Sequence, residues 1–263
     1  MKKFENKTVW ITGASSGIGE ALAHEFAKEG ARLVLSARNA EALRRVADAC
    51  GRPDTIIQTL DLADHGSLPG VVQAVLAKAG QVDVLVNNGG ISQRSLAKDT
   101  KFEVDQKLVN VNLLGTIALT KAILPHFLER KTGHFVVITS LTGKFGTQLR
   151  SSYAAAKHGL HGFFDSLRAE VWRDNVQVTL VCPGFISTKV SVNALTGDGS
   201  PQGTMDNATR AGKSPEALAK AIVAAVRKGK YELLFGGNEV LGVYLKRFFP
   251  TLFTNMLRKA KVT

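Results

Sequence analysis

Short apolar runs alternate along the chain with segments in which apolar residues recur every three or four positions. The first run, at 9–11, predicts a buried strand, and Ile18, Leu22 and Phe26 follow it at helical spacing until Gly30 closes the segment. Further strands are predicted at 32–37, 55–60, 82–86, 134–139, 176–181 and 231–235, and further helices at 40–49, 67–79, 102–128, 151–173 and 214–227. Strands that alternate with helices form a parallel sheet with helices on both faces, so we predict a doubly wound α/β fold with seven parallel strands.

Signals between the elements support this division. Ser67 is predicted to cap the helix that follows it, and Ser214-Pro215 is a favourable start for the last helix of the sheet region. The longest connection, 191–213, is rich in Asn, Thr, Gly, Ser and Asp, and a connection of that length inside a compact domain is usually functional. We therefore predict that 191–213 is a lid above a substrate.

The pattern contains no repeat, linker or low-complexity tract, so we predict a single domain over 1–263 with its core at 1–237. The remainder, 238–263, is an amphipathic and basic extension in which Pro250 separates two short helices, with Lys261 among its cations. Its apolar side packs on the domain, forms a dimer interface, or lies on an anionic bilayer as a peripheral membrane contact. The sequence leaves these three alternatives open.

Composition narrows the classes of partner. A hydrophobic content of 44% supports a large core, and the net charge of +12 suits an anionic cofactor or an acidic membrane surface. The basic residues are spread along the chain without an aromatic-interleaved stripe, so we predict no nucleic-acid partner. Cys50 and Cys182 form no disulfide framework and no Cys/His group at metal-ligand spacing, so no metal is predicted. The first residues lack the apolar core of a signal peptide, which predicts a reducing, cytoplasmic location.

The most informative local pattern is Tyr153 followed four residues later by Lys157. Three alanines lie between them and favour helix, and residues four apart share one helical face. A cation beside a phenol favours the phenolate and lowers the phenol pKa, which suits a general acid. The same spacing also occurs on ordinary amphipathic helices, so the pair gains weight only from the rest of the chain.

Glycines connect the first strand to the first helix. Gly13, Gly17 and Gly19 stand where backbone amides approach a pyrophosphate in dinucleotide folds, although a tight turn without a ligand needs glycine too. Arg38 ends the second strand, where NAD-binding folds place an acid, and its planar fork suits the 2′-phosphate of NADP. The alternative is a solvated loop arginine. Asp61 after the third strand either caps a turn or reaches an adenine.

Polar residues end two further strands. The segment 87–90, Asn-Asn-Gly-Gly, follows the fourth strand, and Ser140 follows the fifth. Open α/β sheets bind ligands at this carboxyl edge. Asn112 lies in an apolar helical stretch, where a buried amide requires hydrogen-bond partners.

Taken together, these residues resemble the short-chain dehydrogenase/reductase family in its compact, single-domain branch, over residues 6–235. The motifs that carry the resemblance are Thr12-Gly13-x-x-x-Gly17-Ile18-Gly19, Asn87-Asn88-Gly89-Gly90, Tyr153-x-x-x-Lys157 and Pro183-Gly184-Phe185-Ile186-x-Thr188. The resemblance implies a Rossmann-type, NAD(P)-binding domain.

The resemblance also implies a role for each matching residue. Tyr153 would protonate the carbonyl oxygen and Ser140 would polarise it, while Lys157 would hold the nicotinamide ribose and lower the phenol pKa. Asn112 would hold a water that links Lys157 to solvent. The implied cofactor-binding residues are Gly13, Ser15, Ser16, Gly17, Ile18, Gly19, Arg38, Asp61, Leu62, Asn88, Gly89, Gly90, Tyr153, Lys157, Pro183, Gly184, Ile186 and Thr188.

We therefore expect an oxidoreductase that interconverts a carbonyl and a secondary alcohol by hydride transfer, with NADP(H) preferred over NAD(H). Its partners would be a small-molecule carbonyl or alcohol substrate and further copies of itself, as a homodimer or homotetramer. The alternative is a catalytically silent NADP-binding regulatory protein. The complete set of Asn112, Ser140, Tyr153 and Lys157 argues against it, since a protein that only binds has no need of an acid and a polariser.

Overall fold

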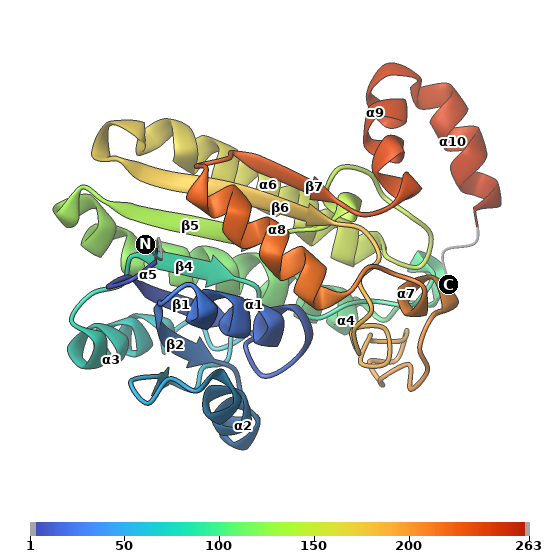
Figure 1. The fold of residues 1–263 in the computed structure, drawn as a ribbon. Coiled ribbons are helices and arrows are strands. Elements are labelled where there is room, and N and C mark those ends of the chain that lie inside the picture. The colour runs from blue at the N-terminus through green and yellow to red at the C-terminus, as the bar shows by residue number, and fades with distance from the viewer. Residues whose placement is uncertain (1–3, 261–263) are drawn as a thin grey trace.

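Seven parallel strands form one sheet in the order β3-β2-β1-β4-β5-β6-β7 within residues 4–260, which the computed structural model describes (Figure 1). The strands are β1 (Thr8–Thr12), β2 (Arg32–Ser36), β3 (Ile56–Ile57), β4 (Val84–Asn87), β5 (Gly133–Ile138), β6 (Val176–Pro183) and β7 (Glu232–Phe235). The predicted doubly wound, seven-stranded parallel sheet is confirmed. The ends of the predicted domain, with Lys261, lie outside the described residues.

The strand order reverses direction at β1. In register, Trp10 of β1 pairs with Val34 of β2 on one side and with Leu85 of β4 on the other. Connections after these strands therefore leave the sheet in opposite directions and open a crevice at the carboxyl ends of β1 and β4. This switch point is where the glycine motif and the Asn-Asn-Gly-Gly motif meet.

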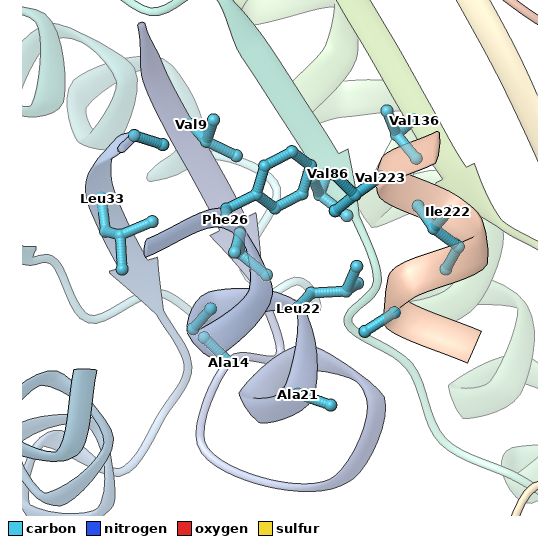
Figure 2. Close-up of a cluster of buried hydrophobic side chains, with 14 of the residues drawn as sticks. Val9, Ala14, Ala21, Leu22, Phe26, Leu33, Val86, Val136, Ile222 and Val223 are labelled. Atoms are coloured by element: carbon cyan, nitrogen blue, oxygen red, sulfur yellow. The ribbon is translucent and has the colours of Figure 1, made fainter. Parts of the chain in front are cut away.

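Helices cover both faces of the sheet. One face packs against α1 (Gly17–Lys28), α2 (Ala40–Cys50) and α8 (Pro215–Arg227), and the other against α3 (Leu68–Ala79), α5 (Gly115–Arg130) and α6 (Ser151–Glu170). Figure 2 shows Phe26 of α1 and Val223 of α8 meeting Val9 and Val86 of the sheet. Burial of each large apolar side chain contributes about 1.5–3 kcal/mol, so this packing holds the carboxyl edge in place.

Two predicted elements differ in detail. The third strand is shorter than 55–60, because the ladder holds Ile56–Ile57 alone while Leu60 still donates to the Ala37 carbonyl at 3.2 Å. Ser67 does not cap α3, since it is itself helical and its hydroxyl donates to the Asp64 carbonyl at 2.9 Å. Ser214 does cap α8, as predicted, by accepting from the Ala217 amide at 3.2 Å.

The predicted helix at 102–128 is a continuous run of three parts: α4 (Phe102–Val109), a π-helical segment at Asn110–Leu114, and α5. By length and composition, Phe102–Arg130 is apolar enough to cross a membrane, since an 18-residue stretch within it has a mean hydropathy of 1.4. In this fold, however, Ile123 and Phe127 are fully buried against the sheet. The run is therefore a core helix here, and its π-helical segment carries Asn112.

The segment predicted as a lid, 191–213, is folded against the domain. It contains the short helix α7 (Asn207–Arg210), and Ala194 and Leu195 are buried. Leu195 forms an isolated parallel bridge with Gln93. The remaining short helical turns in the described residues lie at Ala97–Asp99, Leu141–Gly143, Trp172–Asp174 and Asn238–Val240.

The C-terminal extension forms α9 (Leu241–Phe248) and α10 (Pro250–Lys259), with Pro250 starting the second helix as predicted. Both helices pack on their own domain, which is the first of the three alternatives. Lys246 Nζ donates to the Lys144 carbonyl at 2.9 Å, and the rings of Phe253 and Phe145 meet edge to face at 5.1 Å. The helices α9 and α10 lie next to each other, at the end of the sheet toward which the strands point (Figure 1).

Candidate active site

The glycine-rich turn leaves the carboxyl end of β1 and enters α1. Gly13 and Gly17 have φ angles of +64° and +58°, a left-handed conformation that glycine adopts without steric cost. A Cβ on Gly13 would lie 2.8 Å from the Gly89 Cα, so the turn lies against the end of β4. There Asn88 Nδ2 donates to the Thr12 carbonyl at 2.9 Å. Two motifs that are far apart in sequence thus form one structural unit.

The start of α1 is accessible to a ligand. Its N-cap, Ser16, is extended, and its side chain makes no capping hydrogen bond. Such a helix start presents backbone N–H groups and the positive end of the helix dipole, which suits a pyrophosphate. A Cβ on Gly17 would lie 3.2 Å from Thr188 Cγ2, so the loop after β6 closes over the same turn. These residues fit the phosphates of a dinucleotide. The other predicted residues of this turn are Ser15, Ile18 and Gly19.

The predicted adenosine end lies at the carboxyl ends of β2 and β3. Arg38 is exposed just after β2, while Leu62 is buried with its side chain 2.8 Å from where a Gly89 Cβ would stand. Asp61 Oδ1 accepts from the Ala63 amide at 2.9 Å. Asp61 therefore caps a turn, as one of its two alternatives proposed, and the residue is exposed.

Arg45 of α2 is a further cation at this end that the sequence pattern did not single out. Its Nη2 donates to the Ser15 carbonyl at 3.3 Å, and its Nη1 pairs with Glu20 at 2.7 Å. Only the packing of α2 against α1 brings it to the glycine turn.

Tyr153 lies in the first turn of α6, where a side chain from another segment accepts hydrogen bonds from the helix backbone. Gln93 is fully buried, and its Oε1 accepts from the amides of Ser152 at 3.0 Å and Tyr153 at 3.3 Å. A side chain from the loop after β4 thus caps α6 in place of the N-cap residue Arg150, which makes no side-chain capping bond. A lone Gln in a loop carries no sequence signal for this role.

Ser140 and Tyr153 line the same cavity, and Ser140 acts to lower the pKa of the Tyr153 phenol. Ser140 Oγ in turn accepts from the amide and the hydroxyl of Thr142, at 3.1 and 2.9 Å. This short network fixes the orientation of the serine. The two predicted hydroxyl groups therefore line one cavity, although they lie on α6 and at the end of β5.

The expected effect of Lys157 on the phenol is corrected by the structure. Burial raises the pKa of Tyr153, and the Ser140 hydrogen bond together with the cations Arg150 and Arg94 opposes that rise without cancelling it. Lys157 Nζ donates to the Ile138 carbonyl at 2.8 Å and lies 5.7 Å from the tyrosine ring centroid. Burial lowers the pKa of Lys157 to about 8. Burial thus decides the direction of the pKa shift for both groups, and the phenol keeps its proton.

Asn112 lies in the π-helical segment and faces the end of β4. Its Oδ1 accepts from the Ile91 amide and its Nδ2 donates to the Ile91 carbonyl, both at 2.8 Å. A Cβ on Gly90 would lie 2.8 Å from Asn112 Oδ1 and 3.9 Å from Lys157 Nζ. Gly90 therefore lies next to both side chains, and a Cβ there would crowd Asn112. π-helical segments often occur at functional sites.

The loop after β6 completes the edge. Gly184 donates to the Phe235 carbonyl at 2.7 Å, and Glu239 Oε1 accepts from the Phe185 amide at 3.3 Å. Pro183 and Gly184 face the same cavity as Tyr153, whereas Ile186 is buried and Thr188 meets the glycine turn. Pro183, Gly184 and Thr188 thus border the crevice, whereas Ile186 packs in the hydrophobic core.

A buried ion pair borders the site, and no sequence motif pointed to it. Arg94 Nε and Nη2 both donate to Asp206 Oδ2, at 2.8 and 2.5 Å, and Arg150 Nη2 lies 3.6 Å from the same oxygen. Burial favours a neutral carboxyl, but hydrogen bonds from Arg94 and Gln202 and the two cations hold the pKa of Asp206 below its ordinary value. This pair ties the segment 191–213 to the site.

A cavity of about 790 Å³ opens beside Ser140 and Tyr153. Arg94, Arg150 and Thr142 line the part near the phenol. From the predicted lid segment, Thr209 reaches the cavity, whereas α9 and α10 supply a larger share of its wall. The C-terminal helices therefore contribute more residues to this cavity than the segment predicted as a lid.

The structure also brings together a side-chain group that linear spacing did not reveal. Ligand-type atoms of His161, Cys182 and Glu232 lie within 4.8 Å of one another. Lys144 already pairs with Glu232, and burial raises the pKa of the Cys182 thiol to about 11 and lowers that of His161 to about 4. Because Lys144 already pairs with the Glu232 carboxylate, we assign no cation to this cluster.

Proteins that combine this strand order with a glycine turn at the switch point bind dinucleotides in the crevice beyond the strand ends. The fold and the site assign the chain to this Rossmann-type class. Residues 7–198 match the family described as short chain dehydrogenase. "Dehydrogenase/reductase SDR family protein 7-like" of Anopheles gambiae is 44% identical over 267 residues, which cover 98% of this chain and 84% of that protein. The chain belongs to the short-chain dehydrogenase/reductase family and is an oxidoreductase.

Two solved structures share the fold. A short-chain dehydrogenase/reductase from Burkholderia phymatum in complex with NAD superimposes with a TM-score of 0.84 at 22% identity, covering 100% of this chain and 98% of that one. An alcohol dehydrogenase from Thermococcus sibiricus, complexed with 5-hydroxy-NADP, gives a TM-score of 0.75 at 27% identity, covering 88% of this chain and 96% of that one. Both similarities support the Rossmann-type fold described above.

Proposed function

We propose that this protein is an NADP(H)-dependent oxidoreductase that interconverts a carbonyl and a secondary alcohol, with Tyr153 as general acid and base. The observation that carries the proposal is that Tyr153 and Ser140 line the same cavity, with Ser140 close enough to the phenol to lower its pKa. Two hydroxyls on one cavity wall can both reach a single carbonyl oxygen, which is the arrangement that proton transfer requires.

The chain's own residues supply binding, orientation and the proton. The glycine turn and the open start of α1 would hold the pyrophosphate, and Lys157 would hold the nicotinamide ribose. When bound, the cofactor supplies the hydride. Ser140 donates a hydrogen bond to the substrate oxygen, and Tyr153 gives its proton to that oxygen during reduction. Because burial raises the pKa of Tyr153, the phenol is protonated and ready to act as an acid.

The preference for NADP(H) rests on Arg38. The two structural neighbours bind an NAD and an NADP form on the same fold, so the choice of cofactor depends on individual side chains. Arg38 is exposed at the end of β2, where an acid would favour the ribose of NAD, and its guanidinium can pair with a 2′-phosphate.

Substitution of Arg38→Ala should weaken NADPH binding about ten- to a hundred-fold, the loss expected for a hydrogen bond to a charged group, and should leave NADH binding nearly unchanged. Fluorescence titration of the purified protein with each cofactor measures both affinities, with fully buried Trp10 as an intrinsic probe. Arg173→Ala is the control, because it removes the same charge beside Trp172, beyond the end of α6. Equal losses for both cofactors would refute the phosphate assignment.

Assembly as a homodimer or homotetramer and a cytoplasmic location stay predictions. Light scattering on the purified protein measures the first. The second requires imaging of the full-length chain in its own cell.

A further inference from the structure

The cavity beside Tyr153 has a polar part and an apolar part. Polar and charged side chains line the part of the cavity near the phenol. Arg94, Arg150 and Ser140 each act to lower the pKa of Tyr153. Away from the phenol the wall consists mainly of apolar side chains of α9 and α10 together with Phe145 and Phe185. A ligand that fills this space must be polar at its reacting end and apolar along the rest of its length.

The apolar part of the cavity is lined by side chains of α9 and α10. Leu245, Phe253 and Leu257 are half-buried and line it from α9 and α10, and Phe253 packs on Phe145 with ring centroids 5.1 Å apart. A volume of about 790 Å³ lies in the upper range of pockets that enclose a whole organic ligand, which is roughly 300–1,000 Å³. A two- or three-carbon substrate would leave most of this apolar surface in water.

We propose that the substrate is a long-chain aliphatic ketone or the corresponding secondary alcohol, with its oxygen at Tyr153 and its chain beneath α9 and α10. This inference rests on the proposed function. In reduction the carbonyl carbon receives a hydride from the nicotinamide, the oxygen receives the Tyr153 proton, and the C=O π bond is replaced by C–H and O–H bonds. The substrate is reduced and the cofactor is oxidised, so no further reagent is required.

The test is a series of methyl ketones, from butanone to the ketone of twelve carbons, reduced by NADPH in detergent-free buffer. Each methylene that enters the cavity is worth about 0.8 kcal/mol, so kcat/KM should rise roughly three- to four-fold per carbon until the cavity is filled. Leu257→Trp fills part of the cavity wall and should lower the ratio of kcat/KM for the twelve-carbon ketone to that for butanone at least about ten-fold. Asn255→Trp, an exposed position on the same helix that does not line the cavity, is the matched control.

A flat chain-length profile, or equal losses for short and long ketones in Leu257→Trp, would overturn the inference. Binding of dansylundecanoic acid, a fluorescent long-chain probe, separates it from the proposed function. If NADPH binds and the probe does not, the substrate class is wrong and the proposed function stands. If the probe binds and the twelve-carbon ketone displaces it, but no ketone or alcohol turns over with NADPH bound, the proposed function fails and the ligand class stands.

The same two helices also expose apolar side chains to solvent. Leu241, Phe248, Phe249, Leu252 and Met256 are each more than half exposed, and all but Leu252 also border the cavity. Between Leu241 and Lys259 the sequence holds four cations, Lys246, Arg247, Arg258 and Lys259, and no Asp or Glu. Exposed apolar side chains beside cations without acids are typical of helices that lie in the interface of an anionic membrane. A symmetric dimer through this face would bring the same cations together without acidic partners from these helices.

We infer that this face of α9 and α10 docks on an anionic lipid bilayer. Sedimentation with vesicles measures it, comparing phosphatidylcholine alone with phosphatidylcholine that contains phosphatidylglycerol. Binding should require the anionic lipid, and Arg247→Gln with Arg258→Gln should weaken it roughly twenty-fold or more, at about 1 kcal/mol per cation. Lys228→Gln with Lys230→Gln removes the same charge between α8 and β7 and should have little effect. Equal binding to both vesicles, or dimerisation abolished by Phe248→Asp without vesicle binding, would overturn the inference.

Discussion

Substitution of Tyr153→Phe is expected to lower kcat by roughly two orders of magnitude or more, the range typical of a removed general acid. The ring keeps its packing at the start of α6, so the affinity for NADPH should remain close to that of the wild type. The loss is chemical, because the hydroxyl that lines the cavity with Ser140 is the proton donor of the site. Steady-state kinetics with a reducible ketone and a separate NADPH titration measure the two effects.

Tyr231→Phe is the matched control for this experiment. Its ring is 71% exposed and packs beside the Arg168 guanidinium, away from the residues that line the cavity. It loses the same hydroxyl group and should retain full activity. A Tyr153→Phe enzyme that retains most of its turnover would refute the mechanism, and unchanged turnover with lost NADPH binding would assign Tyr153 to the cofactor alone.

The second large effect is expected on stability. Substitution of Asp206→Ala should lower the free energy of unfolding by about 3–5 kcal/mol, the cost of leaving buried charge without its partner. The side chains of Arg94 and Asp206 are 5% and 2% exposed, so water cannot replace the lost carboxylate. Denaturation by urea measures the loss, and Asp206→Asn should fall between Ala and the wild type because it keeps an acceptor oxygen.

Asp198→Ala is the control for this substitution. It removes a carboxylate from the same segment, where Asp198 is exposed and accepts hydrogen bonds from Thr196 and Ser200, so its effect on stability should be far smaller. Asp206→Ala should also reduce kcat/KM, since Arg94 and Thr209 line the cavity and depend on this carboxylate. Equal unfolding midpoints for Asp206→Ala and the wild type would show that the ion pair does not hold the segment.

Part of the site could be predicted because its signals are local. The positions of Gly13, Gly17 and Gly19 mark a strand-to-helix turn, and Tyr153 and Lys157 share a helical face. Such spacings follow from backbone geometry, which needs no knowledge of distant residues. The carboxyl ends of parallel strands then meet at one edge, so Ser140 could be placed there as well.

The errors arose where a property depends on a whole environment. The pKa of Tyr153 was expected to follow its nearest cation in sequence, but burial decides its direction, and Lys157 is directed at the Ile138 carbonyl. Likewise, the sequence did not show that α9 and α10 contribute more residues to the cavity than 191–213, the segment predicted as a lid. Desolvation and enclosure are sums over many neighbours, and neither is visible in a linear pattern.

The sequence by itself determined the alternation of strands and helices, the parallel sheet, the order of the motifs and the family, because each depends on short-range periodicity or on spacing along the chain. The tertiary structure decided which residues support the site. Gln93 holds the start of α6 from 59 residues away, and Arg94 meets Asp206 across 112 residues. The C-terminal helices line the cavity only because the fold returns them to the edge of the sheet beside Tyr153. Contacts of this kind arise from packing, since each partner has an ordinary local sequence until the other is placed against it.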